Sequence, residues 1–284
     1  MKKILITGAN SYIGMSFENF MKQYGGYRID TVDMIDGSWR NKDFSEYDAV
    51  FHVAGIAHAD VKNVSEEEKK KYYVVNTDLT IETAEKAKND GAGQFVFMSS
   101  MIVFGSGDEF VTKDTVPNPD NFYGDSKLRA DMGIHKLESE NFKVVSIRPP
   151  MIYGRGSRGN YPLLAKFAKT APIFPKYDNK RSMLYIENLC GFVKMVIDHE
   201  ENGYFYPQNR EYVNTSELVK EVSEAAGKHI HLTGFFNPII RAAKNNGYIR
   251  KIFGNRCYDT EMSNYHNFEY CVCDFKESVK RTES

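Results

Sequence analysis

Short apolar runs alternate with longer amphipathic ones through the first half of the chain, and this alternation limits the fold more than any other feature. The short runs are apolar throughout and lack the polar alternate positions of a strand with one face in water. Strands of that kind, separated by helices, form a parallel sheet that is covered on both faces. Because crossovers between parallel strands are right-handed, the prediction is an α/β fold with a doubly wound parallel sheet. The expected strands span 3–7, 27–33, 49–53, 94–98 and 142–147, and the expected helices span 12–24, 65–89 and 123–137.

The pattern changes after residue 150, where prolines, glycines and short segments replace the regular alternation. We expect residues 1–150 to form the sheet domain and residues 151–284 to form a small, interleaved α/β part. Pieces of 173–206 are expected to complete the sheet. In this second part we expect helices at 160–170, 187–198, 215–226 and 238–252, and strands at 181–186 and 203–206.

The charge balance argues against several classes of partner. The 284 residues include 37 Lys+Arg and 38 Asp+Glu, so the formal net charge is −1. A nucleic-acid-binding protein usually carries a basic face, and we therefore expect no nucleic-acid partner. No run approaches the ~20 apolar residues of a membrane span, and the apolar run that ends at Gly8 is too short for a signal peptide. We therefore expect no membrane partner and a cytoplasmic location.

Cysteine spacing predicts free thiols and no metal site. A zinc site usually draws its ligands from CxxC pairs, and the chain has none. The expectation is four free thiols in a reducing compartment. The cysteines are Cys190, Cys257, Cys271 and Cys273.

A glycine-containing turn follows the first expected strand and opens the first expected helix, over residues 7–14. In a doubly wound sheet, the pyrophosphate of a dinucleotide binds at this place, against the amino end of the helix. Gly8 permits a tight turn, and Gly14 permits the helix to approach the strand. The residues expected to bind a cofactor here are Gly8, Asn10, Ser11, Tyr12, Ile13 and Gly14.

The next two strand ends extend this candidate cofactor site. Asp33 ends the second expected strand about 20 residues after the turn, where an acid hydrogen-bonds the adenosine ribose. Its carboxylate would repel a 2′-phosphate, so NAD is the expected cofactor, although Arg40 nearby leaves NADP open. At the end of the third strand, the small residues Val53, Ala54 and Gly55 would let the cofactor lie over bare backbone.

Three polar residues near these strand ends have other interpretations. His52 is expected to be packed in the interior. His58 is a loop residue, either near the cofactor or on the surface. Asn76 lies among apolar residues inside the long helix, and because a buried amide needs partners, we expect it to tie neighbouring backbone together.

Tyr123 and Lys127 stand four residues apart, on one face of the helix expected at 123–137. A tyrosine with a pKa near ~10 is a poor base at neutral pH. A lysine ammonium one turn away, together with a positive nicotinamide ring, lowers that pKa and makes the phenol usable as an acid or base. Ser100 follows the fourth expected strand, at the sheet edge where ligands bind, and there it can hydrogen-bond a substrate hydroxyl or ketone.

Taken in order, these motifs and Arg148-Pro149 resemble the extended short-chain dehydrogenase/reductases. More narrowly, they resemble the nucleotide-sugar epimerases, dehydratases and 4-ketoreductases. The resemblance runs from residue 1 to about 200 and is weaker beyond. The chain departs from the family pattern at two places: Ser11 replaces the usual third glycine, and Met151 replaces an asparagine that touches the nucleotide sugar in many members.

The resemblance implies a Rossmann-type NAD-binding domain and roles for individual residues. Tyr123 would be the acid/base, Ser100 would assist it, and Lys127 would hold the nicotinamide ribose. Pro150 would belong to the cofactor site, in the segment where the cofactor-binding and substrate-binding parts meet. The substrate-binding residues implied are Ser100, Asn160 and Arg181, and the planar guanidinium of the last suits a diphosphate.

Several functions remain open under this resemblance. Dehydration is disfavoured, because Met101 and Ile102 replace the acidic pair that follows this position in 4,6-dehydratases. We expect an NAD-dependent 4-epimerase of a UDP-hexose or UDP-N-acetylhexosamine, in the synthesis of surface-polysaccharide precursors. The alternatives are an NAD(P)H-dependent nucleotide-4-keto-sugar reductase and a non-catalytic NAD(P)-binding sensor. Relatives often dimerise through the helices expected at 65–89 and 123–137, so a homodimer is a further expectation.

Overall fold

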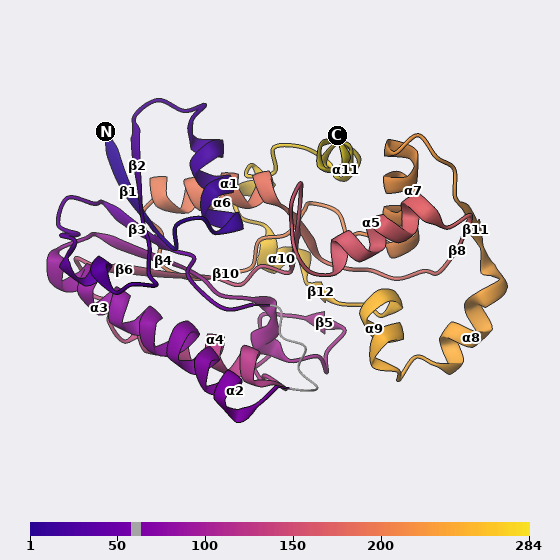
Figure 1. Cartoon of the computed structure of the whole chain (residues 1–284), viewed down its shortest axis with the longest axis horizontal. Helices are drawn as coiled ribbons and strands as arrows, with labels where there is room; N and C mark the ends of the chain where they lie inside the picture. The colour runs from indigo at the N-terminus through magenta and orange to yellow at the C-terminus, as the bar shows by residue number, and fades with distance from the viewer. Residues whose placement is uncertain (58–63) are drawn as a thin grey trace. The chain divides into compact units, whose positions relative to one another are not determined.

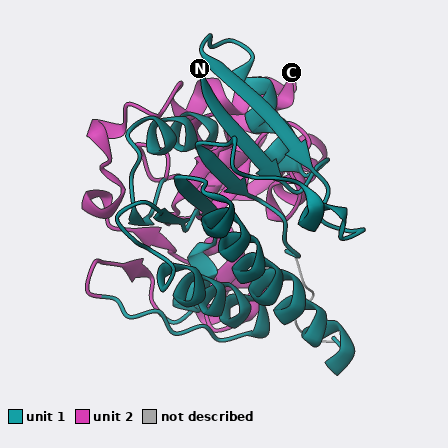
Figure 2. Ribbon diagram, turned by 90° about the vertical axis from the view of Figure 1, so that its left-hand side faces the viewer, with its two compact units in different colours: residues 1–107, 115–149, 190–207 teal, residues 108–114, 150–189, 208–284 magenta. Residues whose placement is uncertain are grey.

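The computed structural model describes residues 1–57 and 64–284, which form two compact units (Figure 1, Figure 2). Unit 1 contains residues 1–107, 115–149 and 190–207, and unit 2 contains residues 108–114, 150–189 and 208–284. Each unit is therefore built from three separate stretches of chain, coloured teal and magenta in Figure 2. His58 lies outside the described residues.

Unit 1 is organised around a six-stranded sheet in which every described pairing is parallel. The chain runs outward from β1 to β2 and returns to β3 on the other side of β1, so the sheet is doubly wound, and the predicted fold class is confirmed. In the register of β1 with β3, Thr7 pairs with His52, so both strands end at the same edge. In spatial order the strands are β10 (Gly203–Phe205), β6 (Lys143–Ile147), β4 (Gln94–Met98), β3 (Ala49–His52), β1 (Lys2–Thr7) and β2 (Tyr27–Val32).

Helices cover both faces of this sheet (Figure 1). On the face of α1, the rings of Phe17 and Phe51 meet edge to face with centroids 5.2 Å apart. On the opposite face, Ala87 and Ile134 are buried in one apolar cluster with Val50, the neighbour of Phe51. Adjacent strand residues point to opposite faces, which explains why these strands are apolar throughout. The helices of unit 1 are α1 (Tyr12–Met21), α2 (Glu66–Tyr73), α3 (Leu79–Asp90) and α4 (Phe122–His135), together with most of α6 (Ile186–Asp198).

The helix expected at 65–89 is present but is not a regular α-helix. Ser65 caps it, and the capping box with Glu68 is complete: Ser65 Oγ accepts from Glu68 N, and Glu68 Oε2 accepts from Ser65 N. Between α2 and α3 the chain forms a π-helical turn, η2 (Val74–Asp78). Helix α1 ends three residues before the expected position, ahead of Gly25 and Gly26, which favour the turn into β2.

Unit 2 combines short parallel strand pairs with a group of helices. Helix α7 packs against both α5 and α11, and the strands pair as β7 with β9, β8 with β11, and β5 with β12. The helices are α5 (Asn160–Thr170), α7 (Thr215–Ala225), α8 (Asn237–Ala242), α9 (Gly247–Phe253), α10 (Thr260–Ser263) and α11 (Phe275–Glu283). The strands are β5 (Phe110–Val111), β7 (Met151–Tyr153), β8 (Ile173–Pro175), β9 (Met183–Tyr185), β11 (His231–Thr233) and β12 (Cys257–Tyr258).

Two expectations for the second half are wrong. The single helix expected at 238–252 is two helices, because α8 ends at Ala242 and Asn246 starts α9 as its N-cap, accepting a 2.9 Å hydrogen bond from Tyr248 N. The strand expected at 181–186 is regular only over β9, and Arg181 instead forms isolated bridges with Val213 and Arg256.

The cysteines and the lengths of the helices complete the description of the fold. All four cysteines are free thiols, and Cys190 and Cys257 are buried. Among the described residues, the helices are too short or too polar to cross a membrane.

Candidate active site

The turn between β1 and α1 is compact because two positions in it have no room for a side chain. Gly8 has a φ of +110°, and a Cβ there would lie 2.9 Å from the backbone nitrogen of Ala54. A Cβ on Gly14 would lie 2.7 Å from Ser11 Oγ and 3.1 Å from Ile6. The turn therefore approaches the end of β3 closely and exposes bare backbone at the sheet edge.

Ser11 explains how the turn forms without a third glycine. It is the N-cap of α1 with a φ of −72°, and its Oγ accepts a 3.1 Å hydrogen bond from Gly14 N. Glycine is not required at that φ. The amides of Tyr12 and Ile13 lie in the first helical turn, where an α-helix has no carbonyl partners for them, so the turn offers donors to an anion. Asn10 has a φ of 64°, a left-handed conformation that asparagine tolerates.

Asp33 and Arg40 lie in the segment that follows β2. Asp33 Oδ1 accepts a 2.6 Å hydrogen bond from Ile35 N, which orders the start of this segment. Arg40 forms a two-point ion pair with Glu82, with an Nη2–Oε2 distance of 2.6 Å, and its guanidinium lies 4.6 Å from the centroid of the Trp39 ring. Arg40, the residue that left NADP open, is therefore already paired with a carboxylate.

His52 at the end of β3 is packed and neutral. Its Nδ1 lies 2.7 Å from Thr7 Oγ1 and its Nε2 lies 3.1 Å from Thr80 Oγ1. Thr80 donates its own hydroxyl proton to Asn76 O at 2.8 Å, so Nε2 must be the donor and Nδ1 the acceptor. Burial lowers the pKa of His52 to about 3. A buried neutral ring with both nitrogens bonded agrees with the packed interpretation.

Asn76 ties three segments together from within the π-helical turn. Its Oδ1 accepts a 2.8 Å hydrogen bond from Ile56 N, and its Nδ2 donates to Ile56 O at 3.0 Å and to Ser126 Oγ at 3.1 Å. The side chain thus links the loop after β3 to α4, as expected for a buried amide. Single π-turns inside helices often occur at functional sites, which is consistent with this position.

Lys127 places a buried ammonium group at the end of β4. Its Nζ donates a 2.9 Å hydrogen bond to Met98 O and lies 4.6 Å from the centroid of the Phe97 ring. A Cβ on Gly55 would lie 3.1 Å from this Nζ, so glycine keeps the space beside the ammonium open. Burial lowers the pKa of Lys127 from 10.5 to about 8, and the negative charge of Asp131 opposes this fall.

The Ser100 hydroxyl lies near enough to the Tyr123 phenol to lower the pKa of that phenol. Tyr123 is the second residue of α4 and is half-buried. Burial raises its pKa, and the nearby Ser100 hydroxyl acts in the opposite direction. Ser100 lies two residues after Met98, whose carbonyl receives Lys127. The structure therefore brings Ser100, Tyr123 and Lys127 together at the end of β4.

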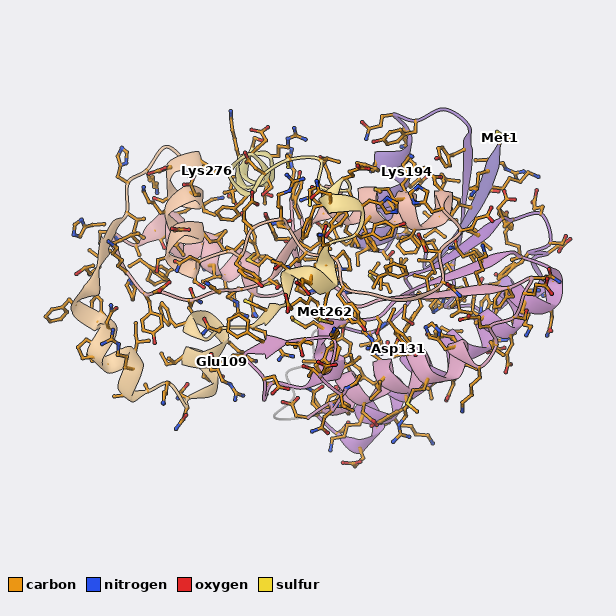
Figure 3. All side chains as sticks on the ribbon, turned by 180° about the vertical axis from the view of Figure 1, so that it is seen from behind. Met1, Glu109, Asp131, Lys194, Met262 and Lys276 are labelled. Atoms are coloured by element: carbon orange, nitrogen blue, oxygen red, sulfur yellow. The ribbon has the colours of Figure 1, made fainter. Side chains whose placement is uncertain are left out.

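A buried ion pair lies one turn further along α4 and is missing from the sequence-based expectations. Asp131, which is labelled in Figure 3, is fully buried. Its Oδ2 accepts 2.9 Å hydrogen bonds from both Arg148 Nε and Ser99 Oγ. The guanidinium of Arg148 lies 4.3 Å from the centroid of the Tyr204 ring. The four-residue spacing from Lys127 to Asp131 is the sequence signal that would have found this residue.

The expected site residues divide between the two units. Pro150 directly precedes β7, and Asn160 is exposed as the first residue of α5. Arg181 is partly buried, its Nη1 donates a 3.0 Å hydrogen bond to Gly254 O, and burial lowers its pKa. These three belong to unit 2. Unit 1 contains all the others: Gly8, Asn10, Ser11, Tyr12, Ile13, Gly14, Asp33, Val53, Ala54, Gly55, Ser100, Tyr123 and Lys127.

Comparison with known proteins decides the family. The model of the NAD dependent epimerase/dehydratase family matches residues 4–207. The chain belongs to this family. Its relatives within the NAD-dependent epimerase/dehydratase family include 4-epimerases and 4-keto reductases, so the predicted resemblance is confirmed.

One curated relative and two solved structures illustrate this range. The chain is 29% identical to a UDP-glucose 4-epimerase from Vibrio cholerae over 253 residues, or 80% of this chain and 76% of that protein. The NAD complex of a UDP-glucuronic acid 4-epimerase from Bacillus cereus has the same fold, with a TM-score of 0.74, 17% identity, and coverage of 99% of this chain and 95% of that one. A dTDP-4-dehydrorhamnose reductase from Bacillus anthracis in complex with NADP gives a TM-score of 0.73 at 19% identity and covers 99% of both chains.

Proposed function

We propose that the protein is an NAD-dependent nucleotide-sugar 4-epimerase that acts on a UDP-hexose or UDP-N-acetylhexosamine. The observation that carries the proposal is that the Ser100 hydroxyl lies near the Tyr123 phenol, with buried Lys127 one helical turn further along α4. A phenol, a hydroxyl and an ammonium at one strand end can take a proton from a secondary alcohol and stabilise the charge on its oxygen. Similarity to a UDP-glucose 4-epimerase over 80% of the chain supports this reaction. We place the reaction in the cytoplasm, in the synthesis of surface-polysaccharide precursors.

The turn and the strand ends have the features that a dinucleotide requires. At Gly8 and Gly55 a Cβ would crowd Ala54 or Lys127, so a ligand can lie directly on the backbone there. The amides of the first turn of α1 would hold the pyrophosphate, and Asp33 would hold a ribose hydroxyl. The cofactor-binding residues of this proposal are Gly8, Asn10, Ser11, Tyr12, Ile13, Gly14, Asp33, Val53, Ala54, Gly55, Tyr123, Lys127 and Pro150.

Two features favour NAD over NADP. Asp33 would repel the 2′-phosphate of NADP, and Arg40 is already paired with Glu82, so neither residue supplies a phosphate site. The choice bears on the reaction, because an epimerase recycles its cofactor whereas a reductase must draw on a pool of reduced cofactor.

The residues of the chain divide the chemistry as follows. Bound NAD supplies the capacity to accept a hydride from sugar C4 and to return it. Tyr123 takes the proton of the 4-hydroxyl and later gives it back, while Ser100 donates a hydrogen bond to the same oxygen. The positive charge of Lys127 favours the phenolate form of Tyr123, and its Nζ would also bind the nicotinamide ribose.

Epimerisation adds a requirement on binding. The keto sugar must present its other face before the hydride returns, so the protein must hold the nucleotide firmly and the sugar loosely. We assign the nucleotide end of the substrate to Arg181 and Asn160. A guanidinium offers a planar set of donors that matches a diphosphate.

Two other functions use the same residues. A nucleotide-4-keto-sugar reductase would use Tyr123 to donate a proton to the keto oxygen while NAD(P)H reduces the carbon. A sensor would bind NAD(P) without turnover.

The test begins with the absorbance spectrum and released nucleotide of the purified protein, because an epimerase is expected to retain NAD. The protein is then incubated with UDP-glucose or UDP-N-acetylglucosamine without added cofactor.

The proposal predicts the 4-epimer as the product, and a Tyr123→Phe variant is expected to lose at least ~100-fold in kcat while still binding NAD. Tyr72→Phe is the matched control, because its ring lies 6.1 Å from that of Tyr123 and it also loses one hydroxyl. No epimer, with NAD(P)H consumed on a 4-keto sugar, would establish the reductase instead. Cofactor binding without either reaction would establish the sensor.

A further inference from the structure

One surface of unit 2 exposes large apolar side chains where the fold does not need them. It lies on the consecutive short helices η4 (Gly234–Phe236), α8 and α9. Phe235, Ile239 and Tyr248 are 78%, 66% and 69% exposed. Scattered exposed apolar residues are ordinary, but three within fourteen residues of one segment form a concentrated apolar group. We call the exposed side chains of residues 235–251 the α8–α9 surface.

The same surface is strongly basic. Residues 235–253 contain four cations and no acid, although the whole chain has a net charge of −1. The cations lie between apolar residues along the segment, and all four are exposed. They are Arg241, Lys244, Arg250 and Lys251.

The underside of this segment is anchored, so the exposed residues belong to an ordered surface. Ile240 and Phe253 are buried, and the ring of Phe253 packs against those of Phe174 and Tyr177 with centroids 5.7 and 5.5 Å away. Asn237 Nδ2 donates a 2.9 Å hydrogen bond to Lys176 O. The buried side chains therefore attach the segment to unit 2, whereas the side chains of Phe235 and Ile239 bury little of their surface.

We propose that the α8–α9 surface docks on an anionic lipid bilayer. Cations on such a surface are attracted to acidic headgroups, and aromatic and aliphatic side chains enter the boundary between headgroups and acyl chains. Because no described helix is long and apolar enough to span a bilayer, the attachment is peripheral. The sequence analysis expected no membrane partner from the lack of a spanning segment, and a surface contact of this kind gives no such signal.

The first test is co-sedimentation of the full chain with vesicles. One set is an equal mixture of phosphatidylglycerol and phosphatidylcholine, and the other is phosphatidylcholine alone. We expect binding to the anionic vesicles, weaker binding to the neutral ones, and loss of binding when salt rises from about 0.1 M to about 1 M, which shortens the Debye length from about 10 Å to about 3 Å. Equal binding to both vesicles, or none to either, would overturn the proposal.

Variants then assign the binding to this surface. The double variant Arg241→Gln/Lys244→Gln is expected to bind anionic vesicles about 30-fold more weakly, at about 1 kcal/mol for each charge. Lys70→Gln/Lys71→Gln is the matched control, because it removes two exposed cations from α2 and is expected to bind normally. Likewise Phe235→Ser/Ile239→Ser should weaken binding, whereas Ile35→Ser/Val116→Ser, at still more exposed positions in unit 1, should not. Equal effects of test and control variants would contradict the assignment.

A tryptophan fluorescence measurement tests the same membrane contact without comparing variants that could differ in stability. Trp39 is the single tryptophan and is fully buried, so Phe235→Trp adds one exposed reporter to a constant background. Its emission should shift to the blue on anionic vesicles and be quenched by lipids brominated on their acyl chains. An unshifted emission would overturn the proposal. So would a Phe235→Ser/Ile239→Ser variant that changes the sedimentation coefficient of the lipid-free protein, because a second copy of the chain would then cover this surface.

Discussion

Replacing Lys127 with methionine should make the protein without cofactor more stable near neutral pH. The ammonium is buried at the end of β4, and burial lowers its pKa from 10.5 to about 8. Keeping the group charged in the folded protein therefore costs about 3 kcal/mol, at 1.36 kcal/mol for each pKa unit. Methionine has a similar length and packs well against the Phe97 ring that the ammonium now faces.

The opposing loss is the hydrogen bond from Nζ to Met98 O, worth about 1 kcal/mol. The net prediction is a gain of about 2 kcal/mol for Lys127→Met at pH 7. Between pH 8 and 10.5 the unfolded chain holds this proton and the folded protein does not, so wild-type stability rises with pH relative to the variant. The advantage of the variant should therefore disappear across that range, while turnover is lost at every pH.

Urea unfolding of the protein stripped of nucleotide measures this directly. The fluorescence of Trp39, buried in unit 1, reports the unfolding of the unit that holds Lys127. Lys88→Met is the control, because Lys88 is a half-buried lysine that donates a 2.7 Å hydrogen bond to Leu137 O, and it should lose about 1 kcal/mol. A Lys127→Met variant less stable than the wild type at pH 7, or an advantage that persists at pH 10.5, would refute the reasoning.

Three further substitutions test other parts of the site. Ser100→Ala removes the hydroxyl that lowers the pKa of Tyr123, so the acidic limb of the profile of kcat/KM against pH should move to higher pH, which a pH series of initial rates would show. Gly8→Ala should abolish NAD binding in calorimetry, because its Cβ meets backbone at 2.9 Å, whereas Gly91→Ala, with a φ of +100° but open space, should lose only about 1 kcal/mol of stability and bind NAD normally. Asp131→Leu removes the carboxylate that forms the buried ion pair with Arg148 and should cost about 3–5 kcal/mol in urea unfolding, with Asp131→Asn losing less.

The sheet was predictable because its signal is local. Apolar runs such as the one around Val50 have no polar alternate positions, and this composition already indicates that both faces of the strand are buried. The turn at Gly8 marks where the first strand ends. Ser65 and Glu68 marked a helix start in the same way, through a contact between near neighbours. These features need no knowledge of residues far away in the chain.

The features that the sequence did not reveal depend on distant partners or on small differences in geometry. The burial of Asp131 is tolerable only because Arg148, on another element, supplies the opposite charge. The break between α8 and α9 arises because Asn246 can cap a helix as well as sit within one. The roles of Ser100, Tyr123 and Lys127 in catalysis stay predictions, although the structure shows them together.

The π-helical turn between α2 and α3 allows no change in the number of residues that join these two helices. An α-helix turns about 100° for each residue, and a π-turn holds one residue more than an α-turn. On one side of it, Tyr73 reaches Asp125 with a 2.8 Å hydrogen bond, and within it Asn76 reaches the loop after β3. Deleting one residue from Val74–Asp78 would leave helix content and composition almost unchanged but would rotate Tyr73 away from α4. A one-residue gap at this place, in an alignment of related chains, would therefore mark a protein in which the end of β3 and α4 are joined differently.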